Sequence, residues 1–314
     1  GYALEYASNE LKGNFDILKA AVKQDGYALE YASNELKGNF DIVMGAVKQN
    51  GSALLYASND LKGNFDIVMS AVKNNGSALR CASDKLKGDF DIVMAALKNY
   101  AWVLEYASDE LRGNFDIVMV AIKMNGFTLV YASIGLQGNF DIVMAAVKQD
   151  GWALKYASIE LRGDKDIVLT AVKNDSVGAA LGYASEGELK GDFDIVMAVI
   201  KNKPWALEYA STAMTNDQQI MTAAVKKDGS TLSFASDELK GDFDIVMAAV
   251  KHHGYSLRHA SNELRGDKDI VLTAVKNDSV GAALGYASEE LKGDFDIAIK
   301  QCGLALRYAS KELT

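Results

Sequence analysis

Residues 26–50 read GYALEYASNELKGNFDIVMGAVKQN, and variants of this stretch fill almost the whole chain. Counted from its first glycine, the unit has 25 positions and ends with Asp or Asn, as in Asp25 and Asn50. Such a side chain accepts hydrogen bonds from the free N–H groups at a helix start, so a helix is predicted to begin at position 1. The only proline of the chain, Pro204, falls at this position, where its missing N–H costs nothing.

Apolar residues at positions 3, 4, 7 and 11 predict one amphipathic helix over the first half of the unit. Position 13 is glycine in the full copies except one, which has Asn216. Both residues tolerate left-handed backbone angles, so a left-handed helix end is predicted there. The invariant serine at position 8 is expected to let helices approach closely and to bond its hydroxyl to a backbone carbonyl.

A second helix is predicted over positions 15–24. Asn39 at position 14 is expected to cap it, and positions 17, 18, 21 and 22 carry the inward apolar residues. Asp41 near the start of this helix and Lys48 near its end both complement the helix dipole.

Neither helix is expected to be stable alone, because isolated helices of about 10–12 residues are marginal in water. Stacked copies bury one another's apolar faces, so we predict an all-α fold, an elongated, curved or superhelical α-solenoid of 25-residue helix–turn–helix repeats. One array is expected over residues 1–314, with about twelve units, irregular units at 176–203 and 279–302, and a C-terminal half unit. The chain starts at a unit boundary and stops within a unit, so a segment of a longer rod is expected.

Charge and composition narrow the classes of partner. The net charge is −9 and acidic residues alternate with Lys and Arg, so no basic stripe forms and nucleic-acid binding is not expected. The sequence has no apolar run of about 18 residues, so membrane insertion is not expected. Cys81 and Cys302 lie far apart, which favours a reducing, cytoplasmic compartment. A targeting signal could precede Gly1, so the localisation stays open.

The repeat motif resembles domain-of-unknown-function family 4116 over essentially the whole chain. The match is carried in residues 26–50 by Ala28, Leu29, Tyr31, Ala32, Ser33, Glu35, Leu36, Asp41, Ile42, Val43, Ala46, Val47 and Lys48. The family supplies no catalytic residues to transfer. The resemblance implies a tandem-repeat protein, for which a scaffold or effector-module role is an analogy with other repeat proteins.

No pattern in the sequence predicts a catalytic, cofactor or metal site. The repeated serine would need a base, yet the chain has only His252, His253 and His259, all in one region. The pair Asp242 and Asp244 flanks a turn far shorter than the loop of a calcium site, so helix capping explains it better. The three histidines have no cysteine near them, so a metal site is not predicted. Tyrosine at position 6 is predicted to be a half-buried packing residue. We therefore predict a protein that is not an enzyme.

Positions 2, 5 and 9 vary most, and their spacing places them on one face of the predicted first helix. This face becomes apolar over a few successive copies, and an exposed apolar patch marks a partner site. Neutral variation with added packing between helices is the competing explanation. The predicted partner-binding residues are Trp102, Phe127, Val130, Ile134, Trp152 and Ile159.

Two functions are compatible with these observations. The first is a non-catalytic structural or scaffolding protein, a rod or filament segment that contacts other proteins through the variable face of the first helix or self-associates end to end or side by side. The alternative is a peptide- or protein-recognition solenoid of an effector or signalling protein. No cofactor is expected in either case.

Overall fold

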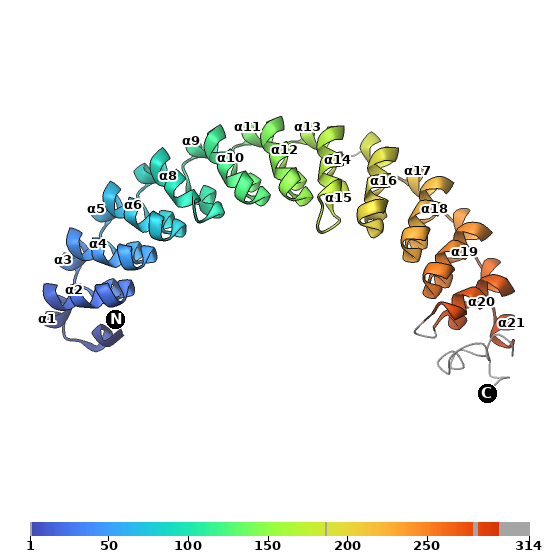
Figure 1. Cartoon of the computed structure of the whole chain (residues 1–314), viewed down its shortest axis with the longest axis horizontal. Coiled ribbons are helices and arrows are strands. Elements are labelled where there is room, and N and C mark those ends of the chain that lie inside the picture. Colours follow the sequence, from blue (N-terminus) through green and yellow to red (C-terminus); the bar gives the residue numbers. More distant parts are fainter. Residues whose placement is uncertain (1, 186, 279–281, 295–314) are drawn as a thin grey trace. The chain divides into compact units, whose positions relative to one another are not determined.

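The structure is a computed structural model that describes residues 2–185, 187–278 and 282–294 (Figure 1). The described residues form α-helices and 3-10 helices joined by turns, and no strand occurs among them. Contacts divide the chain into two units, which meet in sequence between Ser158 and Ile159. Each unit is a stack of helical repeats, which confirms the predicted all-α solenoid class.

Each copy contains three helical pieces where the sequence predicts two. In the copy 26–50 these are the 3-10 helix η2 (Gly26–Tyr31) and the α-helices α3 (Asn34–Lys37) and α4 (Phe40–Gln49). The predicted continuous first helix is therefore wrong.

The break between η2 and α3 comes from Ser33, which has an extended backbone with ψ 156°. Its Oγ accepts a hydrogen bond from the Leu36 N–H at 3.4 Å, so this serine caps α3, whereas the predicted bond from the serine hydroxyl to a backbone carbonyl is found at Ser185, whose Oγ donates to the Ile159 carbonyl at 2.9 Å. The N–H of Ser33 donates to the Lys12 carbonyl of the preceding copy at 3.0 Å. This backbone bond recurs between copies in both units, the last from Ser288 to Arg265.

The predicted left-handed end at position 13 is also wrong. Gly38 has φ −96° and ψ −3°, which are right-handed values. Among the described residues, positive φ occurs at Gly178 and Gly187, both in the irregular copy. The N–H of Gly38 bonds to the Glu35 carbonyl at 3.1 Å, so α3 ends in a tight turn that leads directly into the cap of α4.

The second helix is confirmed as predicted. The Asn39 side chain accepts a hydrogen bond from the Ile42 N–H at 3.2 Å, and the inward residues Ile42, Val43, Ala46 and Val47 are fully buried. The residue at position 25 is a helix cap as well, since the Asp25 carboxylate accepts from the Tyr27 N–H at 3.0 Å, although the helix it caps is 3-10.

The remaining helices of unit 1 follow the same order of 3-10 helix, short α-helix and long α-helix. They are η1 (Tyr2–Tyr6), α1 (Asn9–Lys12), α2 (Phe15–Gln24), η3 (Gly51–Tyr56), α5 (Asn59–Lys62), α6 (Phe65–Asn74), η4 (Gly76–Cys81), α7 (Asp84–Lys87), α8 (Phe90–Leu97), η5 (Ala101–Tyr106), α9 (Asp109–Arg112), α10 (Phe115–Met124), η6 (Gly126–Tyr131), α11 (Ile134–Gln137), α12 (Phe140–Gln149) and η7 (Gly151–Tyr156).

Unit 2 has the same three pieces per copy, but a 3-10 helix replaces the short α-helix in some copies, and in the irregular copy the α-helix α15 replaces the first 3-10 helix. Its helices are α13 (Ile159–Arg162), α14 (Lys165–Lys173), α15 (Ala180–Tyr183), η8 (Glu188–Gly191), α16 (Phe193–Asn202), η9 (Pro204–Tyr209), α17 (Thr212–Thr215), α18 (Gln218–Lys227), η10 (Gly229–Phe234), η11 (Leu239–Gly241), α19 (Phe243–His252), η12 (Gly254–His259), η13 (Leu264–Gly266), α20 (Lys268–Lys276), η14 (Ala283–Tyr286) and α21 (Glu289–Lys292). The predicted half unit after residue 302 and Cys302 lie outside the described residues, and the single array over residues 1–314 stays a prediction.

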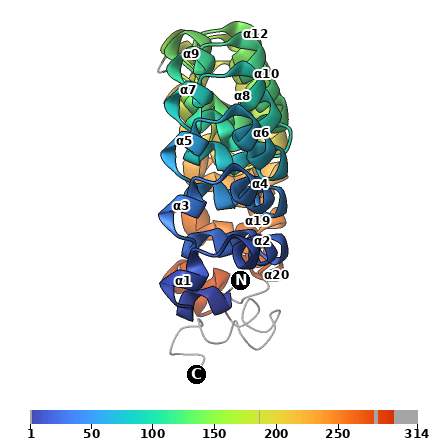
Figure 2. The same cartoon turned by 90° about the vertical axis from the view of Figure 1, so that its left-hand side faces the viewer.

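Equivalent pieces of successive copies lie side by side within unit 1. The long helices α4, α6 and α8 follow one another along one row, and the short helices α3, α5 and α7 form a second row beside it (Figures 1 and 2). The 3-10 helices form a third row, because η2 contacts η3 and η3 contacts η4.

Each copy presents different residues to the copies before and after it. In the first copy Leu18 and Val22 are buried, whereas Ile17 is 39% exposed; Ile42, the residue equivalent to Ile17 in the second copy, is fully buried. Position 17 therefore packs against the preceding copy, and positions 18 and 22 pack against the following one. The inward apolar residues of a copy are therefore all buried only when a neighbouring copy lies on each side, as the sequence predicts for a solenoid.

Glycine at position 1 allows the 3-10 helix to lie directly on the long helix of its own copy. Gly51 is buried, and a Cβ atom there would lie 2.3 Å from the Ala71 carbonyl oxygen. In the copy that begins with Ala101 this residue is partly exposed.

The side chain at position 24 ties adjacent copies together. Asn74 Oδ1 accepts a hydrogen bond from the Gly51 N–H at 2.7 Å, and its Nδ2 donates to the Lys48 carbonyl of the preceding copy at 3.0 Å. One amide therefore fixes the start of its own copy and the end of the copy before it.

The irregular copy 176–203 is organised by a buried carboxylate. Asp175 accepts hydrogen bonds from the N–H groups of Val177 at 2.9 Å and Ala180 at 2.6 Å, which folds the two extra residues into a loop. Gly178 has φ 87°, and a Cβ atom there would lie 2.5 Å from the Trp205 ring. Glycine is therefore required at this position by both its backbone angle and its close contact with Trp205.

Candidate interaction surface

Aromatic side chains at positions 2 and 6 pack between copies along the row of 3-10 helices. The ring of Trp102 meets that of Tyr131 in the next copy at 5.9 Å between centroids, with the planes at 81°. Phe127 meets Trp152 at 5.3 Å and 80°. These edge-to-face contacts between successive copies add stability beyond area burial.

The predicted residues Trp102, Phe127, Val130 and Trp152 lie on η5, η6 and η7, and all four are half-buried. The structure brings Phe127 and Trp152 into direct contact, whereas Trp102 contacts Tyr131. The other part of each ring remains open to solvent.

The predicted residues Ile134 and Ile159 are the first residues of α11 and α13, and they are 86% and 68% exposed. Positions 2, 5 and 9 do not lie on one helix, because the extended break at positions 7 and 8 separates position 9 from the other two. The premise of a single helical face is therefore wrong. Ile159 also belongs to unit 2, whereas the other five residues belong to unit 1.

Three tyrosines at position 6 have a pKa above the ordinary value, so each keeps its phenol proton at neutral pH. Burial raises the pKa of Tyr56, Tyr106 and Tyr131, and carboxylates raise it further, from Glu30 near Tyr56 and from Glu105 near the other two. Each phenol therefore presents an O–H group that can donate a hydrogen bond. The surface combines aromatic rings with phenol hydroxyl groups, and aromatic residues are enriched in protein interfaces.

Sequence reasoning missed a second set of exposed apolar residues, at position 15. We call it the phenylalanine row: Phe40, Phe65, Phe90, Phe115 and Phe140, the first residues of α4, α6, α8, α10 and α12. Each ring is 41 to 44% exposed. The signal in the sequence was an apolar residue that recurs in successive copies yet falls outside the inward positions 17, 18, 21 and 22.

The three histidines have separate structural roles. His252 Nδ1 accepts a hydrogen bond from the Gly229 N–H at 3.3 Å, and the His253 ring lies 6.3 Å from that of Tyr255. Burial, with added repulsion from Arg258, lowers the pKa of His259. Among the described residues no group of three or more His, Cys, Asp or Glu side chains is placed to hold a metal ion.

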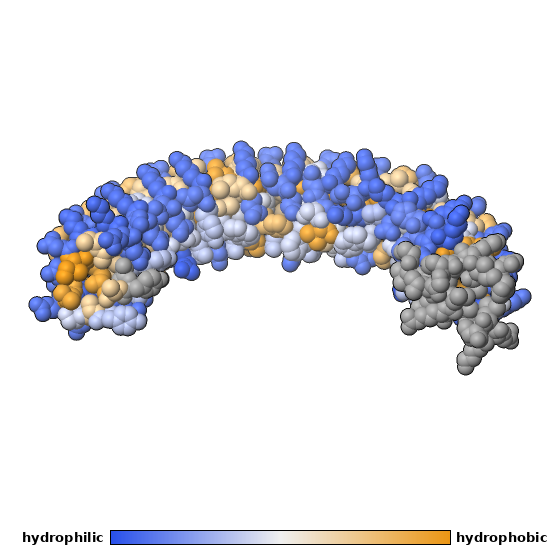
Figure 3. All heavy atoms as spheres, turned by 60° about the horizontal axis from the view of Figure 1, so that its bottom comes forward, coloured by the Kyte–Doolittle hydropathy of each residue, from blue (hydrophilic) through white to orange (hydrophobic). Residues whose placement is uncertain are grey.

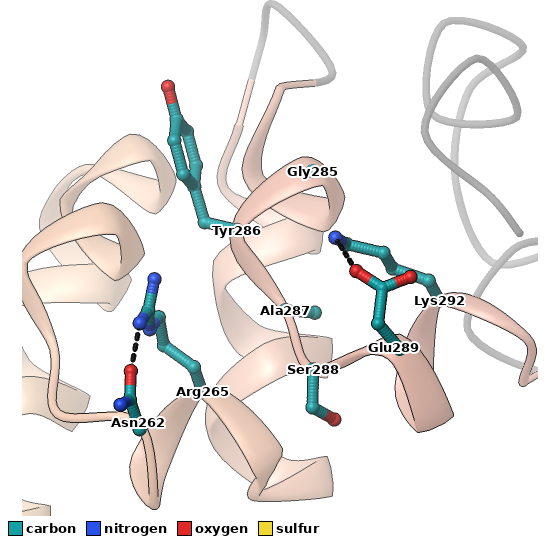
Figure 4. A pocket seen from close by; sticks show the side chains of 8 residues that line it. All are labelled: Asn262, Arg265, Gly285, Tyr286, Ala287, Ser288, Glu289 and Lys292. Carbon is teal, nitrogen blue, oxygen red and sulfur yellow. Dashed lines mark hydrogen bonds and ion pairs between the residues drawn. The ribbon is translucent and has the colours of Figure 1, made fainter.

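A groove of about 370 Å³ lies in unit 2 where the last two described copies meet (Figure 4). Gly285 in its lining occupies position 5, where other copies carry longer side chains such as Glu105. Arg265 is hydrogen-bonded to Asn262, and Lys292 Nζ lies 2.6 Å from Glu289. Its lining residues are Asn262, Arg265, Gly285, Tyr286, Ala287, Ser288, Glu289 and Lys292.

Lys292 and Glu289 in this groove form an ion pair, Arg265 is hydrogen-bonded to the Asn262 amide, and Ser288 is a helix cap. Ser288 Oγ accepts from the Leu291 N–H at 3.4 Å. No nucleophile with an adjacent base occurs among the eight lining residues. The groove is therefore a feature of repeat packing.

Hydrophilic residues cover most of the face drawn in Figure 3, with hydrophobic residues in small separate groups. Among the described residues no helix is long and apolar enough to cross a bilayer.

The stacked helical copies, the repeated backbone bond between them and the exposed aromatic rows define an α-solenoid repeat protein. The family model described as Domain of unknown function (DUF4116) matches this chain in nine overlapping segments, and the chain belongs to that family. The matched residues are 1–37, 15–62, 39–87, 64–112, 89–137, 139–190, 164–215, 217–265 and 267–314. No curated protein and no solved structure matches the chain.

Proposed function

We propose that this chain is a non-catalytic structural or scaffolding repeat protein that holds other proteins against the apolar surface of unit 1. The observation that carries the proposal is the exposure of Ile134, which is 86% open to solvent beside a row of half-buried aromatic rings. The proposed contact residues in unit 1 are Trp102, Phe127, Val130, Ile134 and Trp152.

The same positions are polar elsewhere in the chain, which supports a role outside folding. Position 2 is Ser52 and Ser77 in two copies, and position 9 is Asn34 and Asn59. Those copies form the same helices, so an apolar residue at positions 2 and 9 is not required for the repeat to fold. Trp and other aromatic residues dominate the binding energy of protein interfaces, because a rigid ring buries a large area at little entropic cost.

A non-catalytic role agrees with the repeat fold and with a family of undefined function. Most of the repeated serines cap helices, as Ser33 does, and His252 and His253 are engaged with the backbone and with a neighbouring ring. Each copy offers the same shallow surface, whereas an enzyme concentrates its catalytic groups in one cleft.

The proposal includes a rod or filament role, in which copies of the chain associate end to end or side by side. Ile159, at the start of unit 2, is proposed as a separate contact because it is 68% exposed.

The test replaces contact residues by the residues that other copies carry at the same position. The variant Trp102→Ser, Phe127→Ser, Ile134→Asn and Trp152→Ser follows Ser52, Ser77 and Asn34. Leu55→Glu, at an exposed position 5 outside the surface, is the matched control. The full-length wild-type chain and both variants are used as baits for quantitative affinity capture, and their self-association is measured by sedimentation velocity.

We expect the fourfold variant to lose bound proteins or self-association, with the control unchanged and the far-ultraviolet circular dichroism of all three alike. Ile159→Asn is tested separately and is expected to weaken contacts made through unit 2. Equal capture by wild type and the fourfold variant would refute the surface. Capture of short peptides in place of folded proteins would favour the alternative, a peptide-recognition module.

A further inference from the structure

The phenylalanine row is a second apolar surface, on different helices from the aromatic surface proposed above. Position 19, one helical turn after each ring, is methionine, as in Met44 after Phe40 and Met69 after Phe65, and these methionines are half-buried. Residues four apart lie together on a helix face, so each long helix of the row presents a ring and a thioether as a pair. Methionine is adaptable and is common at surfaces that bind partners.

The fold does not require phenylalanine at this position. In unit 2 the position is Lys165, Gln218 or Lys268 in three copies, and α14, α18 and α20 form there as usual. The inward residues behind Lys165, such as Ile167 and Val168, remain fully buried. Completion of the core therefore does not explain the exposed rings of unit 1.

Each long helix of the row carries a carboxylate near its start and an ammonium group near its end. Position 16 is aspartate and position 23 is lysine, from Asp41 and Lys48 on α4 to Asp141 and Lys148 on α12, and these side chains are exposed. None of them has an ion-pair partner within the described part of the chain. The two charges of one helix stand seven residues apart, about 10.5 Å along its axis. The helix dipole favours this placement, so the charges alone do not indicate a partner.

Two grooves show that these positions form one open face. In unit 2, positions 15, 16, 19, 20 and 23 of one copy line a groove of about 480 Å³; they are Gln218, Gln219, Thr222, Ala223 and Lys226. In unit 1, a groove of about 370 Å³ is lined by Lys19 and Lys23 of α2 and by Asp41, Gly45 and Lys48 of α4, among others. The face therefore continues from one long helix to the next. It has rings and aspartates along one edge, lysines along the other, and methionines and small residues such as Gly45 between them.

This face is complementary to itself when the long helices run in opposite directions. A two-fold axis along the row places position 16 of each chain opposite position 23 of the other, and position 19 opposite position 20. Each aspartate then faces a lysine, each ring comes beside that lysine, and each methionine faces position 20. The chain itself shows that a lysine can lie on such a ring, since Lys19 Nζ lies 5.4 Å from the centre of the Phe15 ring.

A second copy of the chain also matches the row in spacing. A partner that covers several long helices has to present its groups at the repeat distance of the stack, and an identical row does so whatever that distance is. The long helices of unit 1 follow a curve (Figure 1), so two rows related by this axis meet over a short stretch and diverge beyond it. We place that stretch at the middle of the row, on α6, α8 and α10.

We propose that two copies of the chain associate side by side through the phenylalanine row, with their long helices antiparallel and a two-fold axis along the row. The inference rests on the proposed side-by-side association and assigns it a surface and an orientation. Capture of other proteins through Trp102 and Ile134 uses different residues, so the two proposals can fail separately.

The assay is analytical ultracentrifugation of the full-length chain over a range of concentrations. The first variant is Phe65→Gln, Phe90→Gln and Phe115→Gln, which copies the natural Gln218. Phe193→Gln with Phe243→Gln is the matched control, since these rings stand alone between copies with Lys165, Gln218 and Lys268. We expect the wild-type chain and the control to dimerise alike, and the triple variant to dimerise at least about tenfold more weakly.

Charge reversal tests the facing of the two edges. One variant reverses the aspartates (Asp66→Lys, Asp91→Lys and Asp116→Lys), and the other reverses the lysines (Lys73→Asp, Lys98→Asp and Lys123→Asp). Each alone should be monomeric, because like charges then face each other. An equal mixture of the two should dimerise again, because each reversed aspartate faces a reversed lysine. Far-ultraviolet circular dichroism checks that both fold, since the reversed charges oppose the helix dipole.

Neutralising one edge tests the orientation. Asp66→Asn, Asp91→Asn and Asp116→Asn should weaken the dimer, because each aspartate loses the attraction of a lysine. A tighter dimer would show that the aspartates of the two chains face each other, which would reject the antiparallel arrangement.

Three further results would overturn the proposal. The first is a wild-type chain that stays monomeric at about 200 µM, where a dimer with a Kd of about 10 µM would be largely formed. The second is equal dimerisation of the wild-type chain and the phenylalanine variant, and the third is a mixture of the two folded charge variants that stays monomeric. Dimers that survive in the phenylalanine variant and are lost when Trp102, Phe127, Ile134 and Trp152 are replaced would assign the association to the other surface. That result would leave the proposed function standing and reject this one.

Discussion

The two glycine positions of the repeat should respond in opposite ways to a single added methyl group. Gly51→Ala places a Cβ atom 2.3 Å from the Ala71 carbonyl oxygen, whereas at Gly63 the nearest atom, the Asp60 carbonyl oxygen, would be 3.4 Å away. Gly63 has φ −98°, which alanine adopts without strain. Gly51→Ala should therefore destabilise the chain, and Gly63→Ala should be neutral or stabilising.

The expected difference in stability between Gly51→Ala and Gly63→Ala follows from the contribution that the two variants share. Replacing glycine by alanine restricts the unfolded chain and stabilises by about 0.4–1 kcal/mol where the native backbone permits it. This gain is common to both variants, so their difference isolates the steric cost. Overpacking a close contact costs about 1–3 kcal/mol, since η3 has to move off α6.

Native-state hydrogen exchange of the full chain, followed by mass spectrometry on peptides from residues 51–75, measures the local opening free energy. Opening in Gly51→Ala should be roughly 5- to 160-fold more frequent than in Gly63→Ala, which corresponds to the difference of about 1–3 kcal/mol. Equal protection in the two variants, or lower protection in Gly63→Ala, would refute the reasoning. The latter result would restore a left-handed requirement at position 13.

Two further sets of variants test the hydrogen bonds that Asn74 makes between copies and the effect of the half-buried His259 on stability. Asn74→Leu removes the bonds to Gly51 and Lys48 and should cost about 1–2 kcal/mol in urea unfolding, whereas Asn74→Gln, which follows the glutamine found at this position in other copies, should cost less. Burial lowers the pKa of His259 below its usual 6.5, so the unfolded chain binds the proton more readily and stability should fall as the pH drops below that value. His259→Tyr, the usual residue at this position, should flatten the dependence of the unfolding midpoint between pH 8 and 5, and an unchanged slope would contradict this account.

The second helix could be predicted from the sequence because its determinants are local. Asn39 caps it, and Ile42 and Val47 lie on one face whatever the neighbours do. The first half of the unit could not be predicted correctly, because an apolar pattern of helical spacing also fits a 3-10 helix followed by a short α-helix. The 3-10 helix followed by a short α-helix is favoured by a bond that the pattern of one copy does not show, from the Ser33 N–H to the Lys12 carbonyl of the preceding copy.

The sequence predicted only part of the candidate interaction surface. Variation at positions 2, 5 and 9 identified the apolar residues, among them Ile134 with its high exposure. The phenylalanine row was missed because apolar residues were assigned to the core by their spacing. Exposure depends on how far each long helix is covered by its neighbours, and that is a property of the stack.

The sequence alone determined that this protein is a stack of helical copies, since caps and apolar spacing act within a few residues and no copy can bury its own core. The tertiary structure decided where each helix breaks and which apolar side chains meet solvent. Those features depend on backbone bonds such as Ser58 to Lys37 and on contacts such as Gly51 against Ala71. These join residues about twenty positions apart, beyond the few residues over which caps and apolar spacing act.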